Sequence, residues 1–322
     1  HPPTPALYTQ VNSSAASDVY KRQGMAMVDK HILLVAQVLG ERLDDPNWVV
    51  ADCRSELLDR EFGRRSYIEN HIPGAIFLDL DKDLAGPVGP ETGRHPLPSV
   101  ESIVATLSAV GIDKSSNVVV YDQGHGAIAA RAWWILRWLG HESVYVLDGG
   151  FSRWQQLGFP LEAGEIVRVP TQYHESPGVT RVLTTAELEA TLDKLPEHKL
   201  LDARDRQRFL GQLEPIDPVA GHVPGAINLP FSEFVREDGT WLPLEERAAL
   251  LKNALGPDKK VDWSVMCGSG VTACHLAITG IEAGYSEPRL YVGSWSEWIR
   301  DPDRPIATGA ESECGWQTAD LG

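Results

Sequence analysis

The segment Cys267–Gly270 places a single cysteine, two glycines and a serine between an apolar stretch and a helical pattern. The preceding residues Trp263–Met266 are typical of a short buried strand, and 271–283 carry the apolar spacing of a helix. Gly268-Ser269-Gly270 must then form the tight connection, whose glycines let backbone N–H groups turn towards the sulfur. Such amides and the positive end of a helix favour a thiolate over a thiol. The residues therefore indicate a nucleophilic cysteine, with a buried structural thiol as the alternative.

The other three cysteines indicate neither a metal site nor a disulfide framework. Cys53, Cys274 and Cys314 form no Cys-x-x-Cys pair, and no His/Cys cluster accompanies them. We therefore expect no metal, no organic cofactor, and a reducing, cytoplasmic compartment. Cys274 lies two helical turns after Cys267, where we expect a buried thiol, with a redox partnership to Cys267 as the lesser alternative.

The composition is that of an acidic globular protein. Of 322 residues, 43% are hydrophobic and 23% are charged, and the formal net charge is −16. This charge argues against nucleic acid and anionic membranes as partners, and any anionic substrate would need a locally positive pocket. No stretch approaches the roughly 18 apolar residues of a membrane span. The length is sufficient for two domains, each with its own core.

An internal repeat divides the chain into two copies of one domain. Three segments recur in the same order about 150 residues later: Asp52–Arg54 as Asp202–Arg204, His71–Ile76 as His222–Ile227, and Gly149–Trp154 as Gly293–Trp298. We expect a non-native or disordered leader over 1–27 and an N-terminal domain without a catalytic cysteine over 28–160. A linker over 161–180, a catalytic C-terminal domain over 181–307 and a loosely held tail over 308–322, Cys314 included, would follow.

Within each copy, short apolar runs alternate with helical stretches. In the first copy the strand-like runs are Trp48–Ala51, Val118–Tyr121 and Val144–Leu147, and Ala127–Leu139 is helix-like. This alternation predicts an α/β fold in which each mainly parallel sheet is flanked by helices. Ligands of such sheets bind beyond the carboxyl ends of the strands, which is where Cys267 would lie. Asp122 holds the equivalent place in the first copy, so only the second copy keeps a nucleophile.

Together these features resemble the tandem rhodanese-type sulfurtransferases over roughly residues 30–306. Beyond the loop and the repeat, the resemblance rests on Ala132-Trp133-Trp134, Gly140-His141, Leu147–Gly150 and Arg208-Phe209. Within that family, Gly268-Ser269-Gly270 is similar to the loop of the 3-mercaptopyruvate sulfurtransferases, whereas thiosulfate enzymes carry basic residues after the cysteine. The resemblance thus implies two rhodanese-like domains and a 3-mercaptopyruvate sulfurtransferase activity.

The resemblance also implies a mechanism. Cys267 would attack the sulfur of 3-mercaptopyruvate, release pyruvate, and pass its persulfide sulfur to a thiol, to thioredoxin or to cyanide. Ser269 and His71, backed by an acidic residue of the first copy, would supply the proton that pyruvate needs. A carboxylate is expected shortly before His71, but the nearest candidates, Asp59 and Glu61, do not align. The remaining active-site loop residues are Gly268, Gly270, Val271 and Thr272, and Thr272 is expected to hold the loop by hydrogen bonding at the helix start.

Arg208 lies where the family places an arginine for the substrate carboxylate, whose two oxygens fit a guanidinium fork. A second family arginine, about nine residues on, is absent, because Glu214–Pro218 contains none. Arg204 or Arg206 would have to compensate. Arg204 belongs to the repeated Asp-x-Arg pair, however, which favours a structural role.

Other interpretations stay open. A turn-stabilising role suits His71 as well as catalysis does, and it is favoured for His222. Thiosulfate:cyanide sulfurtransferase and a non-catalytic sulfur-carrier module are the alternative functions, while a Cys-x5-Arg phosphatase is disfavoured because position 273 is alanine. Six tryptophans are expected in the core or at the domain interface: Trp133, Trp134, Trp138, Trp154, Trp295 and Trp298. We expect a monomer or weak dimer that uses a small-molecule sulfur donor.

Overall fold

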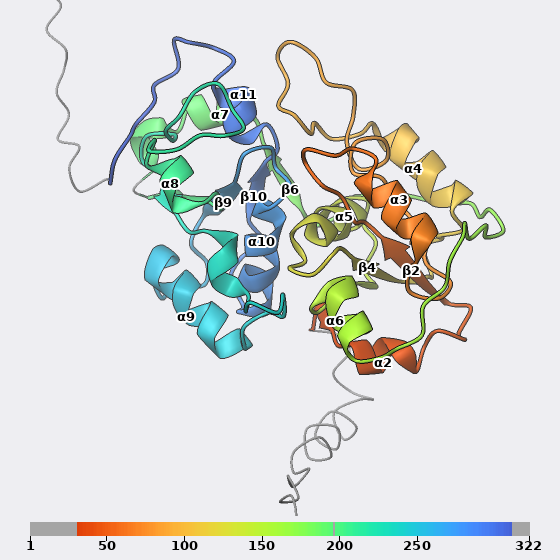
Figure 1. Ribbon diagram of the computed structural model, residues 1–322. Helices are drawn as coiled ribbons and strands as arrows, with labels where there is room; N and C mark the ends of the chain where they lie inside the picture. Colours follow the sequence, from red (N-terminus) through yellow and green to blue (C-terminus); the bar gives the residue numbers. More distant parts are fainter. Residues whose placement is uncertain (1–30, 196, 311–322) are drawn as a thin grey trace, which may run out of the picture. The chain divides into compact units, whose positions relative to one another are not determined.

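The computed structural model describes residues 31–195 and 197–310, and Ile32 onward clusters as one compact unit. The expected leader over 1–27 and Cys314 lie outside the described residues, as does most of the expected tail. Figure 1 shows the described chain with its helices and strands labelled. Two sheets organise it, each with five parallel strands.

The first sheet has the strand order β1-β5-β4-β2-β3. Its strands are β1 (Leu33–Leu34), β2 (Trp48–Asp52), β3 (Ile76–Phe77), β4 (Asn117–Tyr121) and β5 (Val144–Leu147). The helices of this copy are α2 (Ala36–Gly40), α3 (Phe62–Glu69), α4 (Val100–Ala109), α5 (Ala127–Trp138) and α6 (Gly150–Gln156).

The second sheet has the order β6-β10-β9-β7-β8, which is the same topology in the same sequence order. Its strands are β6 (Arg181–Leu183), β7 (Lys199–Asp202), β8 (Ile227–Asn228), β9 (Trp263–Met266) and β10 (Arg289–Tyr291). The α-helices are α7 (Thr185–Glu189), α8 (Arg206–Phe209), α9 (Leu244–Leu255), α10 (Ala273–Glu282) and α11 (Ser294–Trp298), with short 3₁₀ turns at Leu192–Lys194 and Phe231–Phe234. The predicted α/β class and its tandem repeat are therefore confirmed.

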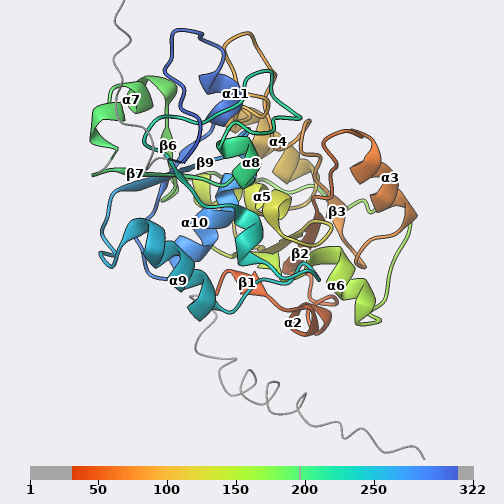
Figure 2. The ribbon, with the colours of Figure 1, turned by 60° about the vertical axis from the view of Figure 1, so that its left-hand side comes forward.

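Helices cover both faces of each sheet, as the two views in Figures 1 and 2 show. In the second sheet, Leu200 and Met266 pack with α7, α8 and α11 in one core, whereas Leu201 and Val265 point into another with α9 and α10. This division follows from the two-residue period of a strand, which sends successive side chains to opposite faces. Both faces are buried, which explains why these strands are mostly apolar, although the buried Ser264 interrupts β9.

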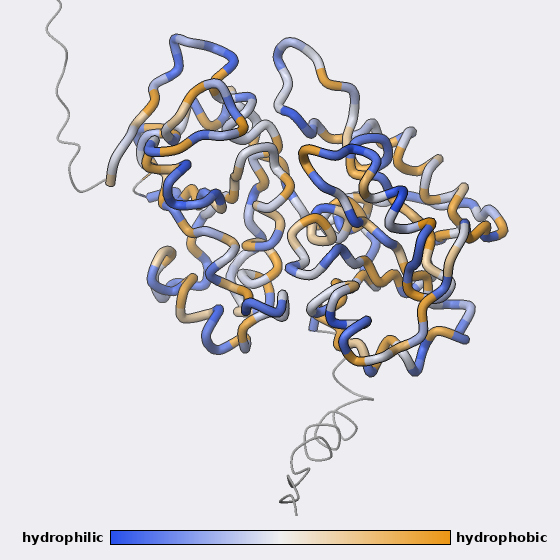
Figure 3. The backbone as a smooth tube through the Cα atoms, viewed as in Figure 1, coloured by the Kyte–Doolittle hydropathy of each residue, from blue (hydrophilic) through white to orange (hydrophobic). Residues whose placement is uncertain are grey.

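One hydrophobic core is shared by the two copies. It includes residues of β2 and β4 from the first sheet, of β7 and β9 from the second, and most of α5 and α10. Helices α5 and α10 pack against each other and are buried around most of their circumference. Figure 3 shows hydrophobic residues along the strands and these helices, with hydrophilic stretches along many loops. The helix that follows the loop of each copy thus belongs to one continuous core.

The repeated Asp-x-Arg motifs make the same structural contacts in both copies. Arg54 pairs with Asp52 at 2.7 Å and Arg204 with Asp202 at 2.7 Å, each fully buried at the carboxyl end of a strand. Each guanidinium also lies over an aromatic ring of its own copy, Phe151 or Trp295. The equivalence confirms the structural role of Arg204. The six tryptophans expected in the core are found there, fully buried except for the partly buried Trp138: Trp133, Trp134, Trp138, Trp154, Trp295 and Trp298.

Candidate functional site

Cys267 directly follows β9, the central strand of the second sheet, and its side chain is buried. The start of α11 holds the backbone there: the Cys267 amide donates to Ser294 Oγ at 3.1 Å, and its carbonyl accepts from the Trp295 amide at 3.0 Å. Ser294 has φ +53°, the one positive φ among non-glycine residues in the described chain. Such a conformation costs energy and persists only where its surroundings impose it. These two hydrogen bonds to the start of α11 therefore fix the position of the Cys267 backbone.

The loop after Cys267 is a row of unused amides. Across residues 31–195 and 197–310, no protein acceptor bonds the backbone N–H groups of residues 268–272. Gly270 adopts φ +74°, and a Cβ there would lie 2.4 Å from the Val292 carbonyl oxygen, so only glycine fits. Amides without a protein acceptor, next to a cysteine and at the start of a helix, are available to bind an anion such as a thiolate or a persulfide. Val271 begins the turn into α10, and Thr272 is the N-cap residue of that helix.

The prediction that the Thr272 side chain holds the loop by a hydrogen bond at the start of α10 is wrong. Its backbone has helical angles, and its side chain caps no amide of α10. A residue in that conformation cannot turn its hydroxyl back to the N2 and N3 amides. The loop is instead held by Arg131 of α5, whose Nη1 donates to the Gly270 carbonyl at 3.0 Å.

Ser269 contacts a histidine of the first copy. Its Oγ lies 2.8 Å from Nδ1 of His95, and Nε2 of the same ring lies 3.2 Å from an Asp81 carboxylate oxygen. Burial, reinforced by the nearby charge of Arg131, lowers the pKa of His95 to about 4. The imidazole is therefore neutral at physiological pH and can exchange a proton with the serine hydroxyl. Ser269, His95 and Asp81 thus form a connected row of polar groups that leads from the loop to the exposed carboxylate.

The structure does not bring His71 to Ser269, so this prediction is corrected. His71 is fully buried, its Nδ1 lies 2.8 Å from the Tyr67 carbonyl, and its ring stacks on Tyr67. His222 does the same in the second copy, with Nδ1 at 2.7 Å from the Phe209 carbonyl and its ring on Phe209. Because the two histidines occupy equivalent places, they stabilise the same turn.

The sequence left the acidic partner of the histidine open. Asp59 pairs with Arg65 at 2.6 Å on the surface, while Asp81 serves the site. One signal in the sequence pointed to His95: it lies in Arg94-His95-Pro96, which has no counterpart in the second copy. Residues shared by the repeats maintain the fold, so chemistry specific to one site must use residues that break the repeat.

Two arginines from different copies line a cavity of about 540 Å³ together with Cys267, Ser269 and His95. Arg208 pairs with Glu214 at 2.9 Å and with Asp217 at 3.0 Å, and Arg94 pairs with Asp217 from the other side. Arg208 therefore lies in the site as expected. The expectation that Arg204 or Arg206 replaces the missing arginine is not met, because Arg204 is bound to Asp202 and Arg206 is exposed. Arg94 is the residue that sequence reasoning missed.

Arg131 connects the loop to the His95 segment. It is fully buried on α5, and besides the Gly270 carbonyl its Nη2 donates to the His95 carbonyl at 3.0 Å. Burial lowers the pKa of this guanidinium. No carboxylate pairs with Arg131 within the part of the chain that the structure describes. This arginine positions both halves of the site.

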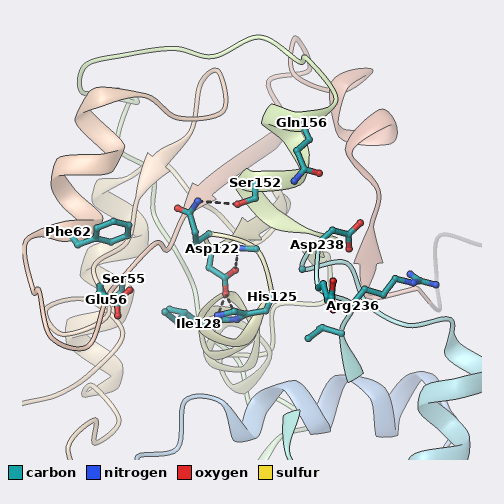
Figure 4. Close-up of a pocket in the computed structure, with 15 residues that line it drawn as sticks. Ser55, Glu56, Phe62, Asp122, His125, Ile128, Ser152, Gln156, Arg236 and Asp238 are labelled. Carbon is teal, nitrogen blue, oxygen red and sulfur yellow. Dashed lines mark hydrogen bonds and ion pairs between the residues drawn. The ribbon is translucent and has the colours of Figure 1, made fainter. Parts of the chain in front are cut away.

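The equivalent loop of the first copy is closed by its own side chain. Asp122 follows β4, and its carboxylate accepts backbone amides of Gly124, Gly126, Ile128 and Ala129 at 2.9–3.2 Å. Asp122 also lines a second pocket of about 450 Å³. Figure 4 shows Asp122 there, with Ser152 and His125 nearby. The amides that stay free in the second copy are thus satisfied here, which explains why one copy alone has a reactive loop.

The other two cysteines that the structure describes are buried thiols. Cys53 and Cys274 are free and fully buried, and burial raises the pKa of Cys274 to about 12. Cys274 Sγ lies 3.6 Å from the Gly270 carbonyl. In residues 31–195 and 197–310 no His, Cys, Asp or Glu side chains gather in a group able to hold a metal ion. The same residues include no helix long and apolar enough to cross a membrane.

Known proteins resemble this chain over most of its length. The family model described as the rhodanese-like domain matches residues 35–157 and again 184–301. The "Probable 3-mercaptopyruvate sulfurtransferase" of Pseudomonas aeruginosa is 48% identical over 282 residues, covering 86% of this chain and 98% of that protein. The "Thiosulfate/3-mercaptopyruvate sulfurtransferase 1, mitochondrial" of Arabidopsis thaliana is 36% identical, covering 83% and 76%.

A solved structure agrees with these relatives. The 3-mercaptopyruvate sulfurtransferase from Leishmania major superposes with a TM-score of 0.74 at 29% identity, covering 85% of this chain and 76% of that one. The family model matches the same two stretches of the chain that form the two parallel α/β units, the second of which contains the cysteine loop. The chain therefore belongs to the rhodanese family and carries two rhodanese-like domains.

Proposed function

We propose that this protein is a 3-mercaptopyruvate sulfurtransferase. One observation carries the proposal: Cys267 stands at the head of five free amides, and Ser269 in the same loop contacts His95 at 2.8 Å. The relatives named for this activity support the same donor. The domains that perform it are taken as 28–160, without a catalytic cysteine, and 181–307, with residues 161–180 as the linker.

The first half-reaction makes a persulfide. The Cys267 thiolate attacks the donor sulfur, a new S–S bond forms, and the donor C–S bond breaks with its electron pair moving to carbon. The carbon fragment leaves as the enolate of pyruvate. The free amides of residues 268–272 can then stabilise the negative persulfide in place of the thiolate.

The enolate needs a proton on carbon, and the thiol proton of the donor is released in the same reaction. Ser269 is placed to pass a proton, because its hydroxyl is hydrogen-bonded to a neutral His95. Asp81 orients that ring from its other nitrogen. Transfer by such a positioned group accelerates a reaction by about 10²–10⁴-fold.

In the second half-reaction, an acceptor takes the outer sulfur and Cys267 returns to the thiolate. A small thiol, thioredoxin or cyanide is the proposed acceptor, since each provides a soft nucleophile that can attack sulfane sulfur. We place the enzyme in the cytoplasm, as a monomer or weak dimer. Both half-reactions use the same cysteine, which requires ping-pong kinetics.

Thiosulfate is the second candidate donor, because a relative carries both donors in its name. Release of sulfite from thiosulfate requires no proton transfer to carbon. The Ser269–His95–Asp81 path would then be without use, so its presence favours 3-mercaptopyruvate. A non-catalytic sulfur carrier would have no need of it either.

The test is sulfur transfer to cyanide, followed as thiocyanate, with 3-mercaptopyruvate and thiosulfate measured side by side. We expect a higher kcat/KM for 3-mercaptopyruvate and no turnover in Cys267→Ser. Cys274→Ser is the matched control, since that thiol is buried seven residues away, and it should keep wild-type turnover. A preference for thiosulfate, or turnover in Cys267→Ser, would overturn the proposal.

A further inference from the structure

Two guanidinium groups converge on the residue after the nucleophile. A Cβ built on Gly268 would lie 2.8 Å from Arg94 Nη2, 3.5 Å from Arg208 Nη2 and 3.6 Å from Arg208 Nη1. Arg94 belongs to the first copy and Arg208 to the second. An anion bound beside Cys267 therefore meets cations from both copies.

Each of these arginines keeps donors free. Arg208 uses Nε on Glu214 and Nη2 on Glu214 and Asp217, while Arg94 uses Nη1 on Asp217. Arg94 Nε is buried and has no hydrogen-bond partner. Among the described residues, Arg94 Nη2 and Arg208 Nη1 donate no side-chain hydrogen bond to the protein. These unused donors belong to side chains that line the cavity of Cys267.

Asp217 joins the two arginines. One of its oxygens pairs with Arg94 and the other lies 3.0 Å from Arg208 Nη2, and its side chain is only 4% exposed. Burial raises the pKa of Asp217, against the opposing effect of Arg94. The Asp217 carboxylate therefore already occupies one donor nitrogen of each guanidinium group.

The charges of this cluster cancel. Arg94 and Arg208 contribute two positive charges, and Glu214 and Asp217 contribute two negative ones. Arg204, whose Nη1 lies 3.6 Å from Glu214, is balanced by its own partner Asp202. A donor with one carboxylate adds a single negative charge, which the free guanidinium donors can bind. Thiosulfate adds two negative charges beside a buried carboxylate, and like charges in a poorly solvated site repel strongly. Selectivity of this kind works by penalising the wrong ligand.

We propose that Asp217 selects the sulfur donor by charge: with Arg94 and Arg208 it forms a neutral fork that admits a monoanionic carboxylate and rejects a dianion. The inference rests on the proposed function, because it assigns the carboxylate of 3-mercaptopyruvate to this fork. It also gives the first copy a direct role in donor binding, through Arg94.

The test is Asp217→Asn, which removes the charge and nearly preserves the shape. We expect its kcat/KM for thiosulfate, relative to that for 3-mercaptopyruvate, to rise at least about tenfold over wild type. Asp217→Glu keeps the charge and should keep the wild-type ratio. Asp238→Asn removes the same charge at an exposed residue that does not line the cavity of Cys267, and it should also leave the ratio unchanged.

Arg94→Gln provides an independent arm. It should raise the KM for 3-mercaptopyruvate at least about tenfold and change kcat less, because the binding interaction is lost while the proton path stays. Arg300→Gln is its control, since Arg300 contacts the Thr92 carbonyl of the same segment from outside the cavity. An unchanged KM in Arg94→Gln would refute its role in donor binding.

Binding separates this inference from the proposed function. In a Cys267→Ser background no turnover occurs, so titration calorimetry can measure thiosulfate binding with and without Asp217→Asn. Tighter thiosulfate binding in the double variant supports the charge filter, and equal binding overturns it, whichever donor the wild-type enzyme turns over. Failure of wild-type protein to use 3-mercaptopyruvate would refute the proposed function alone.

Discussion

The two histidines, His95 and His71, offer a sharp comparison, because the sequence predicted one and the structure selects the other. Asn at position 95 keeps a polar group near the place of Nδ1, which lies 2.8 Å from Ser269 Oγ, but an amide cannot relay a proton. His95 is 6% exposed, so solvent replaces the imidazole poorly. We therefore expect His95→Asn to lower kcat/KM for 3-mercaptopyruvate by about 10²–10⁴-fold, or about 3–5 kcal/mol of transition-state stabilisation.

His71→Asn is the matched control. Its amide nitrogen can still donate to the Tyr67 carbonyl, as Nδ1 does, so the turn survives. Turnover should stay within about threefold of wild type, even if the protein becomes less stable. Both variants are measured with both donors in the thiocyanate assay, after circular dichroism confirms that they are folded.

Thiosulfate sharpens the comparison, because sulfite leaves without a proton on carbon. We expect His95→Asn to change thiosulfate turnover by less than about threefold, so the loss is specific to 3-mercaptopyruvate. Equal losses with both donors would show that His95 supports the loop and moves no proton. Equal activities of the His95 and His71 variants would refute the assignment of the proton path.

Three further predictions concern stability. The pKa of His95 is about 4 in the folded protein and about 6.5 in the unfolded chain. The free energy of unfolding should therefore be at its full value above pH 6.5 and fall by up to about 3 kcal/mol as the pH drops towards 4. In urea titrations at pH 7 and pH 4.5, His95→Asn should show a smaller fall between the two pH values than the wild-type protein. Gly270→Ala should cost about 3 kcal/mol or abolish activity, whereas Gly284→Ala, at φ +82° in open space, should cost only about 1 kcal/mol in the same titration. Asp122→Ala strands four amides and should lower the unfolding free energy by about 3 kcal/mol, and wild-type kcat/KM in the folded enzyme would agree with its structural role.

The alternation of buried strands and helices was readable from the sequence, because each element has a local pattern. The expected strand Trp263–Met266 matches β9, and the expected helix Ala127–Leu139 matches α5 within one residue. The loops of the two copies differ by one residue, since five residues separate β4 from α5 and six separate β9 from α10. Cys267 needed no more than this to be recognised, since a nucleophile at a strand-to-helix turn is defined by its neighbours in sequence.

Residues that reach the site from the other copy could not be placed in this way. His95 and Arg94 lie between β3 and α4, in a segment without regular structure and therefore without periodicity to predict its path. Their positions depend on the packing of α5 against α10 and on the hydrogen bonds of Arg131 to both segments. Asp217 likewise acquires a function only where Arg94 meets it.

The sequence by itself determined the parallel α/β class and the tandem repeat and predicted the nucleophile Cys267, because these depend on contacts within one element or on similarity between the copies. The tertiary structure alone decided that His95 replaces His71, that Asp81 is its acidic partner, and that Arg94 stands where an arginine was missing. The physical reason is distance along the chain: His95 and Ser269 are 174 residues apart, and only the shared core of the two copies brings them within hydrogen-bonding distance.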